Sequence, residues 1–171
     1  MVRVDGKIAS VAPDWRRLPG IAAAIASLPE SSVGEIHTER LTTEALTALA
    51  GTLSWEDFRL FGTKFQVSVW KTLFGLENRL YSYTEFASLC GNPKGVRSVA
   101  HAVGLNPVAL LIPCHRIIPK ESMDRVAEIR RGAESTLFRG SDLYLLDSID
   151  VGEYAFGPDL KRELIKIELG K

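Results

Sequence analysis

The sequence predicts an α+β protein in which a small N-terminal α/β segment precedes a larger domain built on a helix-turn-helix. Three observations predict this class. Short elements separated by turns fill the chain up to Phe58, two helical stretches flank residues 90–92, and an apolar run over residues 108–112 is typical of a buried strand or extended segment. We therefore expect a short N-terminal domain over residues 1–58 and a second domain over residues 59–171.

Two helices are predicted before the middle of the chain. Residues 43–50 favour a helix that ends at Gly51. Thr63 and Gln66 have the spacing of a capping box, in which each side chain bonds the backbone N–H of the other residue. The helix that starts there places three apolar residues on one face, namely Phe65, Val69 and Leu73.

The next two helices form the predicted helix-turn-helix. Ser82 and Glu85 have the spacing of a second capping box, while Asn92 caps the following helix and Pro93 takes its first position. An apolar stripe on that second helix should face the core: Val96, Val99, Ala100 and Val103. The opposite face carries Lys94, Arg97, Ser98 and His101. Small and basic side chains suit a phosphate backbone, although an ordinary αα-hairpin with a solvated face fits these residues equally well.

Composition excludes several classes. Hydrophobic residues make up 46% of the chain and charged residues 25%, values that are typical of a globular protein. No apolar run approaches the roughly 20 residues of a membrane span, and the N-terminus lacks a signal-peptide core, so we expect a cytoplasmic protein with no membrane partner. The two cysteines are too few for a disulfide scaffold and lack the CxxC spacing of a zinc site.

The formal net charge of zero is unevenly distributed along the chain. Residues 1–58 and 132–171 each carry a net charge of −3, whereas residues 59–131 carry +6. A polyanion is therefore expected to bind the middle of the chain, although many basic segments are only solvated faces.

Cys114 is the candidate nucleophile. It follows the apolar run in the order Pro113-Cys114-His115-Arg116, and a neighbouring imidazole or guanidinium favours the thiolate, which is the reactive form of cysteine. A buried inert cysteine is the alternative. Cys90 lies in a turn with no basic neighbour closer than Lys94, so we interpret it as a packing residue.

These residues resemble the O6-alkylguanine-DNA alkyltransferases, also called methylated-DNA–protein-cysteine methyltransferases. The resemblance is carried by residues 91–94 (Gly-Asn-Pro-Lys), 97–99 (Arg-Ser-Val), 106–107 (Asn-Pro) and 112–116 (Ile-Pro-Cys-His-Arg), with Tyr83 upstream. It covers residues 61–118 and resumes at Tyr154. The resemblance implies a winged-helix-like alkyltransferase domain whose active-site cysteine follows a buried strand.

The resemblance also implies catalytic roles. Cys114 is the alkyl acceptor, and His115, oriented by Glu168, draws off the thiol proton through a water. Asn106 holds the turn between the recognition helix and the active-site strand. Tyr83 helps to protonate the guanine as it leaves. The thioether product does not regenerate, so one molecule repairs one lesion, and the chemistry requires no metal or organic cofactor.

The implied partner is double-stranded DNA that contains O6-alkylguanine, bound by a monomer. Arg97 enters the base stack in place of the flipped nucleotide, because an enzyme that acts on a base must extrude it. Tyr83 lies against phosphate, and the recognition helix enters the minor groove with three further contact residues: Lys94, Ser98 and His101. His101 is larger than the residue the family usually has there.

The substrate pocket implied by the resemblance includes Ile117, Tyr154, Ala155, Phe156 and Ala109. Ala109 replaces a proline that commonly lines the pocket, and Phe156 replaces a glycine. Because Phe156 narrows the cavity, we expect a preference for methyl over bulky groups such as benzyl. A closing helix with Leu160, Leu164 and Ile167 then carries Glu168. Asp147 and Asp150 are the alternatives to Glu168 as the carboxylate that orients His115.

Residues 119–153 form an insert that the family usually lacks, and Met123, Val126 and Ile129 predict one amphipathic helix in it. Two other functions stay open. A non-catalytic module of the same fold would bind alkylguanine lesions and recruit repair factors, but relatives of that kind lack the acceptor cysteine. A thiol hydrolase on another fold would leave the helix-turn-helix and Arg97 unexplained.

Overall fold

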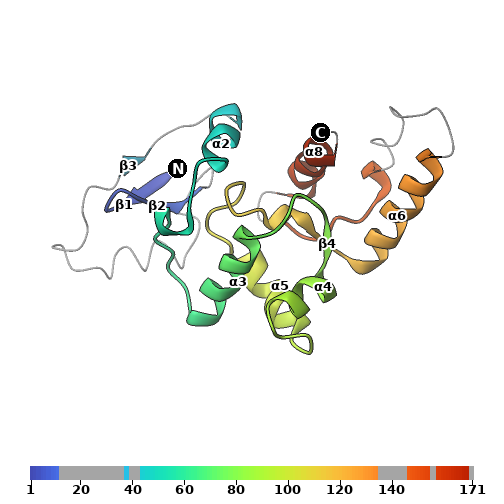
Figure 1. Ribbon diagram of the computed structural model, residues 1–171, viewed down its shortest axis with the longest axis horizontal. Coiled ribbons are helices and arrows are strands. Elements are labelled where there is room, and N and C mark those ends of the chain that lie inside the picture. Colours follow the sequence, from blue (N-terminus) through green and yellow to red (C-terminus); the bar gives the residue numbers. More distant parts are fainter. Residues whose placement is uncertain (12–36, 39–42, 135–145, 155–156, 170–171) are drawn as a thin grey trace. The chain divides into compact units, whose positions relative to one another are not determined.

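The computed structural model describes residues 1–11, 37–38, 43–134, 146–154 and 157–169. They form two compact units, one of residues 1–75 and 105–114 and the other of residues 76–104 and 115–171. Both units combine helices with short strands, which confirms the predicted α+β class (Figure 1). The bounds of these units differ from the predicted domain boundary after residue 58. That boundary stays a prediction.

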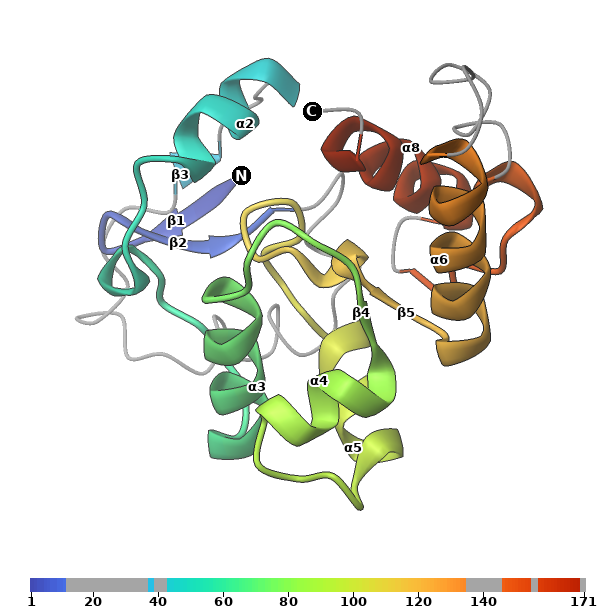
Figure 2. The ribbon, with the colours of Figure 1, turned by 45° about the vertical axis from the view of Figure 1, so that its right-hand side comes forward.

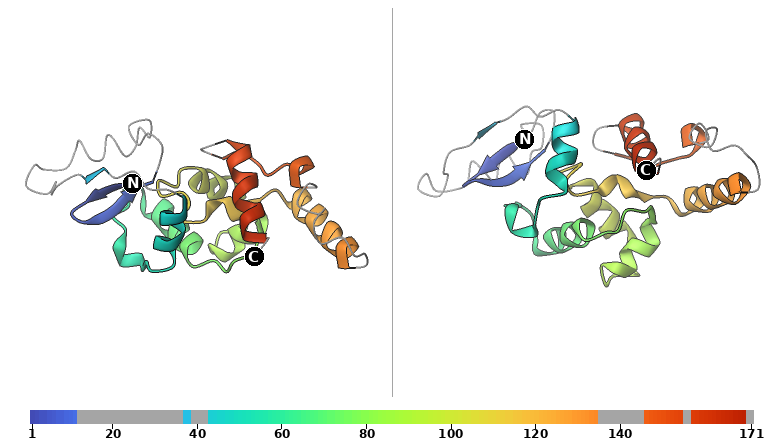
Figure 3. Two further views of the ribbon diagram at one scale, coloured as in Figure 1. Left: turned by 90° about the horizontal axis from the view of Figure 1, so that it is seen from above. Right: turned by 45° about the horizontal axis from the view of Figure 1, so that its top comes forward.

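The first unit starts with an antiparallel hairpin. Strands β1 (Val2–Val4) and β2 (Lys7–Ser10) lie side by side in both views of Figure 3, and β3 (His37–Thr38) pairs with the other edge of β1. Asp5 and Gly6 connect the strands with φ values of 51° and 73°. Two consecutive positive φ values are typical of the type I′ turn, whose twist matches that of the hairpin.

Two helices of the first unit confirm the predicted pattern. Helix α2 spans Thr43–Ala50, and α3 spans Lys64–Phe74 after a short 3₁₀ turn at Trp55–Asp57. The capping box is complete, since Gln66 N–H donates to Thr63 Oγ1 (3.2 Å) and Thr63 N–H donates to Gln66 Oε1 (2.8 Å). Val69, Trp70 and Leu73 are buried on α3, whereas the predicted core residue Phe65 is 39% exposed.

The strand predicted at residues 108–112 is wrong: this run is buried but turns back on itself. Ile112 N–H donates to the Val108 carbonyl (2.9 Å), and Leu110 has a φ of 77°. Only Val108 pairs with another extended residue, Val11, in a single parallel bridge. The cysteine that follows is therefore held at the end of a buried turn.

The second unit contains the helix-turn-helix. Strand β4 (Tyr81–Ser82) leads into α4 (Tyr83–Leu89), and α5 (Val96–Gly104) lies beside α4 (Figure 2). Ser82 Oγ accepts from Glu85 N–H as predicted, but the Glu85 carboxylate bonds Arg79 instead of closing a capping box. Helix α5 begins at Val96 rather than at Pro93, because residues 92–95 form a turn closed by Gly95 N–H and the Asn92 carbonyl.

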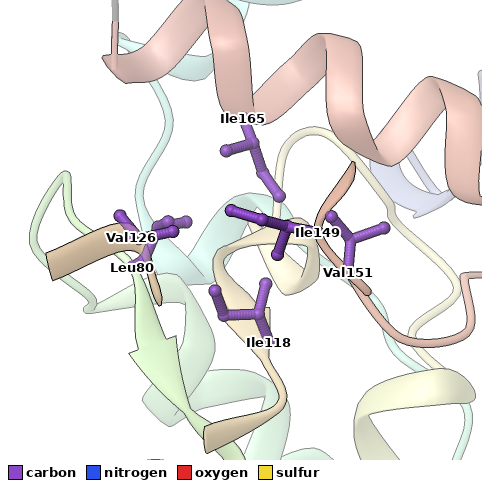
Figure 4. Packing of buried hydrophobic residues seen from close by; sticks show 6 residues of the cluster. All are labelled: Leu80, Ile118, Val126, Ile149, Val151 and Ile165. Atoms are coloured by element: carbon purple, nitrogen blue, oxygen red, sulfur yellow. The ribbon is translucent and has the colours of Figure 1, made fainter. Parts of the chain in front are cut away.

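The same unit holds the segment that the sequence predicts as an insert. After β5 (Ile117–Ile118), which runs parallel to β4, come α6 (Lys120–Glu134), a 3₁₀ turn at Leu146–Ser148 and α8 (Pro158–Leu169). Helix α6 confirms the predicted amphipathic helix. A buried cluster joins these elements: Leu80, Ile118, Val126, Ile149, Val151 and Ile165 (Figure 4). The segment predicted as an insert therefore contributes to the core of this unit.

The buried face of α8 differs from the apolar pattern that predicts this helix. Leu164 is buried, but Leu160 is 41% and Ile167 49% exposed. Lys161 and Ile165 occupy the buried face beside Leu164, with the i, i+3, i+4 spacing of neighbours on one side of a helix. Among the described residues, no helix is long and apolar enough to cross a membrane.

Candidate functional site

Cys114 is the last residue of the first unit and the first residue of a 3₁₀ turn, Cys114–Arg116. Its backbone N–H donates to the Ile112 carbonyl (2.8 Å), and the residue is 6% exposed. Cys90, the other cysteine, is partly exposed at the C-terminal end of α4. The two cysteines therefore differ in burial.

Asn106 holds the buried turn that precedes Cys114. Its Nδ2 donates to the Ile112 carbonyl (2.8 Å), and its Oδ1 accepts from Val108 N–H (3.1 Å). Asn106 is 5% exposed, so both bonds lie away from solvent. One side chain thereby joins the two ends of the turn and fixes the backbone to which Cys114 bonds.

His115 and Arg116 begin the second part of the second unit. His115 is 3% exposed. The Arg116 guanidinium donates to the carbonyls of Leu76 (3.0 Å) and Glu77 (3.1 Å), so it holds the 3₁₀ turn to the segment before β4. Arg116 is thus a structural residue of this unit.

Lys161 is a site residue that sequence reasoning missed. It is 1% exposed, and its Nζ donates to the Ile117 carbonyl (2.7 Å). The same Nζ lies 5.9 Å from the ring centroid of Tyr83 and 6.0 Å from that of Tyr154. The second unit therefore brings together three predicted site residues, Tyr83, Tyr154 and Ile117, around a buried ammonium group.

Tyr83 is the first residue of α4, where Ser82 caps the helix, and its side chain is half-buried. The hydroxyl lies 3.6 Å from the position that a Cβ would take on Gly152, whose φ is 74°. The loop backbone at Gly152 thus borders the hydroxyl of Tyr83. A glycine suits this place because its φ is positive.

The predicted DNA-facing residues lie on α5 and in the turn before it. Lys94, Arg97, Ser98 and His101 are all exposed, whereas Val99, Ala102 and Val103 are buried on α5. The helix thereby buries its apolar side against the unit and leaves its basic side open to a partner.

The side chains of three predicted site residues lie outside the described part of the chain. Ala155 and Phe156 lie outside the described residues, and so does the side chain of Glu168, although its backbone belongs to α8. Ala109 is buried in the turn before Cys114, in the first unit. Within the described ranges, no three His, Cys, Asp or Glu side chains gather as metal ligands do.

Comparison with known proteins first defines the class. Residues 64–135 match the family model described as "6-O-methylguanine DNA methyltransferase, DNA binding domain". This range includes the helix-turn-helix, Asn106 and Cys114, so the resemblance predicted from Pro-Cys-His-Arg is confirmed there.

Particular relatives agree with this class. The chain is 46% identical over 69 residues to a probable methylated-DNA–protein-cysteine methyltransferase of Acanthamoeba polyphaga mimivirus, covering 39% of this chain and 45% of the relative. It is 39% identical over 95 residues to the methylated-DNA–protein-cysteine methyltransferase of Methanosarcina acetivorans, covering 53% and 61%. The chain thus spans about half the length of these curated relatives.

A solved structure extends the likeness to the fold. The crystal structure of O6-methylguanine-DNA methyltransferase from Pyrococcus kodakaraensis matches with a TM-score of 0.53 at 19% identity, over 98% of this chain and 90% of that one. The two chains share a fold.

Proposed function

We propose that this chain repairs DNA by moving the alkyl group of O6-alkylguanine, mainly methyl, from duplex DNA to Cys114. The observation that carries the proposal is the placement of Cys114. It stands in Pro-Cys-His-Arg, within the part of the chain that matches the family model, at the end of a buried turn held by Asn106. A nucleophile needs this fixed geometry, because small misplacements of a reacting atom slow a reaction strongly.

The proposed step is a single displacement. His115, oriented by Glu168, accepts the thiol proton through a water, and the thiolate attacks the alkyl carbon. The sulfur–carbon bond forms as the bond from that carbon to O6 breaks, and the electron pair stays on guanine. Tyr83 supplies a proton to the departing base. The product is a thioether that water does not cleave, so each molecule acts once.

The exposed basic face of α5 supports DNA as the partner. In the proposal Lys94, Ser98 and His101 lie along the phosphate backbone, and Arg97 fills the space of the flipped nucleotide. Extrusion of the base is required because the O6 atom of a stacked guanine cannot reach a buried thiol.

Pocket residues are assigned by the same proposal. Ile117, Tyr154, Ala155, Phe156 and Ala109 line the space that receives the base. Because a phenylalanine stands at position 156 where the family usually has a glycine, we expect a narrower space, and a free benzylguanine probe should label Cys114 much more slowly than methylated duplex DNA does. The Phe156→Gly variant should react with benzylguanine faster than the unaltered protein does. The size preference is contradicted if the unaltered protein reacts with benzylguanine as fast as with methylated DNA.

The experiment that tests the function counts alkyl groups. The protein is incubated with an excess of duplex DNA that carries one O6-methylguanine, and the intact protein mass is recorded over time. Alkyl transfer predicts a gain that stops at one methyl per chain, with the DNA restored to guanine. A lesion-binding module would hold the DNA and gain no mass, and a hydrolase would turn over repeatedly.

A further inference from the structure

The hydroxyl of Tyr83 borders a loop that belongs to the insert. A Cβ on Gly152 would stand 3.6 Å from Tyr83 Oη and 3.4 Å from Pro119 Cδ. A Cβ at this place would make ordinary van der Waals contacts, so the Gly152 backbone lies near the phenol, and a displacement of the loop changes what surrounds it. The position of this loop therefore matters for Tyr83.

Two hydrogen bonds fix the loop. Gly152 N–H donates to Asp150 Oδ1 (2.8 Å), and Ser122 Oγ donates to the Asp150 carbonyl. Ser122 lies in the first turn of α6 and is 4% exposed, so its bond is shielded from water. The start of α6 is thereby joined, through Asp150, to the residue that borders the Tyr83 hydroxyl.

Apolar packing holds the same segment from the other side. Ile149 and Val151 flank Asp150 and are 2% and 1% exposed, in the cluster that also contains Val126 of α6 and Ile165 of α8 (Figure 4). Helix α8 carries Lys161 one turn before Ile165, and its ammonium is 5.9 Å from the Tyr83 ring centroid. Both groups near Tyr83, the loop and the lysine, are thus anchored to the insert.

We propose that Ser122 is a positioning residue for alkyl transfer, which acts through Asp150 and Gly152 to fix the place of the Tyr83 hydroxyl. The inference rests on the proposed function of Tyr83 as proton donor. It gives the insert a role in the reaction: α6 sets the geometry of the donor without touching the base. Loss of the Ser122 hydroxyl frees the loop, and the donor is then less well aligned with the departing guanine.

The test compares Ser122→Ala and Asp150→Ala with Ser88→Ala. Ser88 is exposed in the same unit, and its Oγ bonds the Thr84 carbonyl within α4, so it controls for loss of a serine hydroxyl. The chain has 4 tyrosines. Carbon-13 labelling of their Cζ atoms, with Tyr83→Phe to assign the Tyr83 signal, reports the surroundings of that hydroxyl directly. Thermal unfolding checks that each variant is folded.

We expect Ser122→Ala and Asp150→Ala to shift the Tyr83 signal and to slow methyl transfer roughly tenfold, since misalignment of a reacting group is costly. Ser88→Ala should change neither. Asp150→Ala keeps the carbonyl that Ser122 bonds and removes only the carboxylate that accepts from Gly152 N–H, so it tests the second link between Ser122 and the loop. If Ser122→Ala does not fold, Ser122→Cys, whose thiol is a weaker donor than the hydroxyl, takes its place. A folded variant whose Tyr83 signal stays in place overturns the inference, and so does a shifted signal with an unchanged rate. Absence of methyl transfer in the unaltered protein refutes the proposed function instead, while the Tyr83 signal still decides whether Ser122 sets the position of the hydroxyl.

Discussion

Two buried polar side chains, Asn106 and Lys161, each hold a backbone carbonyl of an otherwise apolar region. Asn106 bonds Ile112 and Val108 in the first unit, and Lys161 bonds Ile117 in the second. Removing one partner from such a bond leaves a buried polar group without compensation, which costs about 1–3 kcal/mol. Both residues should therefore contribute measurably to stability.

For Asn106 we expect Asn106→Ala to lower the free energy of unfolding by about 1–3 kcal/mol, because the Val108 N–H loses its partner and the Ile112 carbonyl keeps only the bond from Cys114 N–H. Denaturant unfolding followed by circular dichroism measures this change. The control is Asn78→Ala, since Asn78 is exposed. If the two variants have equal free energies of unfolding, Asn106 does not stabilise the turn before Cys114.

For Lys161 the corresponding change is Lys161→Met, which keeps the length of the side chain and removes the ammonium. The Ile117 carbonyl is fully buried, and we expect a loss of about 1–3 kcal/mol in the free energy of unfolding. Lys120→Met, at an exposed position, should leave stability within about 0.5 kcal/mol of the original. If Lys161→Met leaves the free energy of unfolding unchanged, the hydrogen bond to Ile117 does not contribute to stability.

Sequence reasoning located the exposed residues of the candidate site better than the buried ones. Lys94, Arg97, Ser98 and His101 are all exposed; the last three follow from the period of α5, and Lys94 lies in the turn before it. Lys161 was missed because lysine is rarely buried, and the carbonyl it bonds belongs to a residue 44 positions away. One signal in the sequence could have indicated that Lys161 is buried: it has the i, i+3, i+4 spacing with the buried residues Leu164 and Ile165.

Helix α5 is the element on which DNA binding depends in the proposed function. Since each neutralised phosphate contributes about 0.9 to the slope of log binding constant against log salt concentration, Lys94→Ala, in the turn before α5, should reduce this slope by about that amount. Arg97→Ala should weaken binding with a smaller change of the slope, because the proposal assigns Arg97 to the base stack and not to a phosphate. Titration of labelled duplex DNA at several salt concentrations gives the slope. Lys120→Ala, at an exposed site on α6, is the control for loss of one positive charge. If the slope for Lys94→Ala equals the slope for Lys120→Ala, the proposed phosphate contact of Lys94 is contradicted.

The elements themselves were predictable where local signals agree. The capping residues Thr63 and Ser82 mark the starts of α3 and α4 as observed. The run at residues 108–112 was mispredicted as a strand because a short apolar run has no period that separates a strand from a buried turn. Its path depends on Asn106, whose amide bonds decide the turn and leave no trace in the hydrophobic pattern.

On the scale of the whole molecule, the chain passes between its two compact units three times, and the last passage falls between Cys114 and His115. The sequence predicted the α+β class and the helix-turn-helix correctly. It did not predict these units, because they depend on packing between distant segments. Residues 105–114, for example, join the N-terminal sheet through the hydrogen bond from Val11 N–H to the Pro107 carbonyl.

The most direct measurement maps the alkylated residue. We compare the unaltered protein with Cys114→Ser and Cys90→Ser. Each is incubated with duplex DNA that contains O6-methylguanine and digested, and the peptide masses are measured by mass spectrometry. We predict one methyl group on Cys114 in the unaltered protein and in Cys90→Ser, and none in Cys114→Ser. A methyl group on Cys90, or full repair by Cys114→Ser, would contradict the assignment of Cys114 as the acceptor.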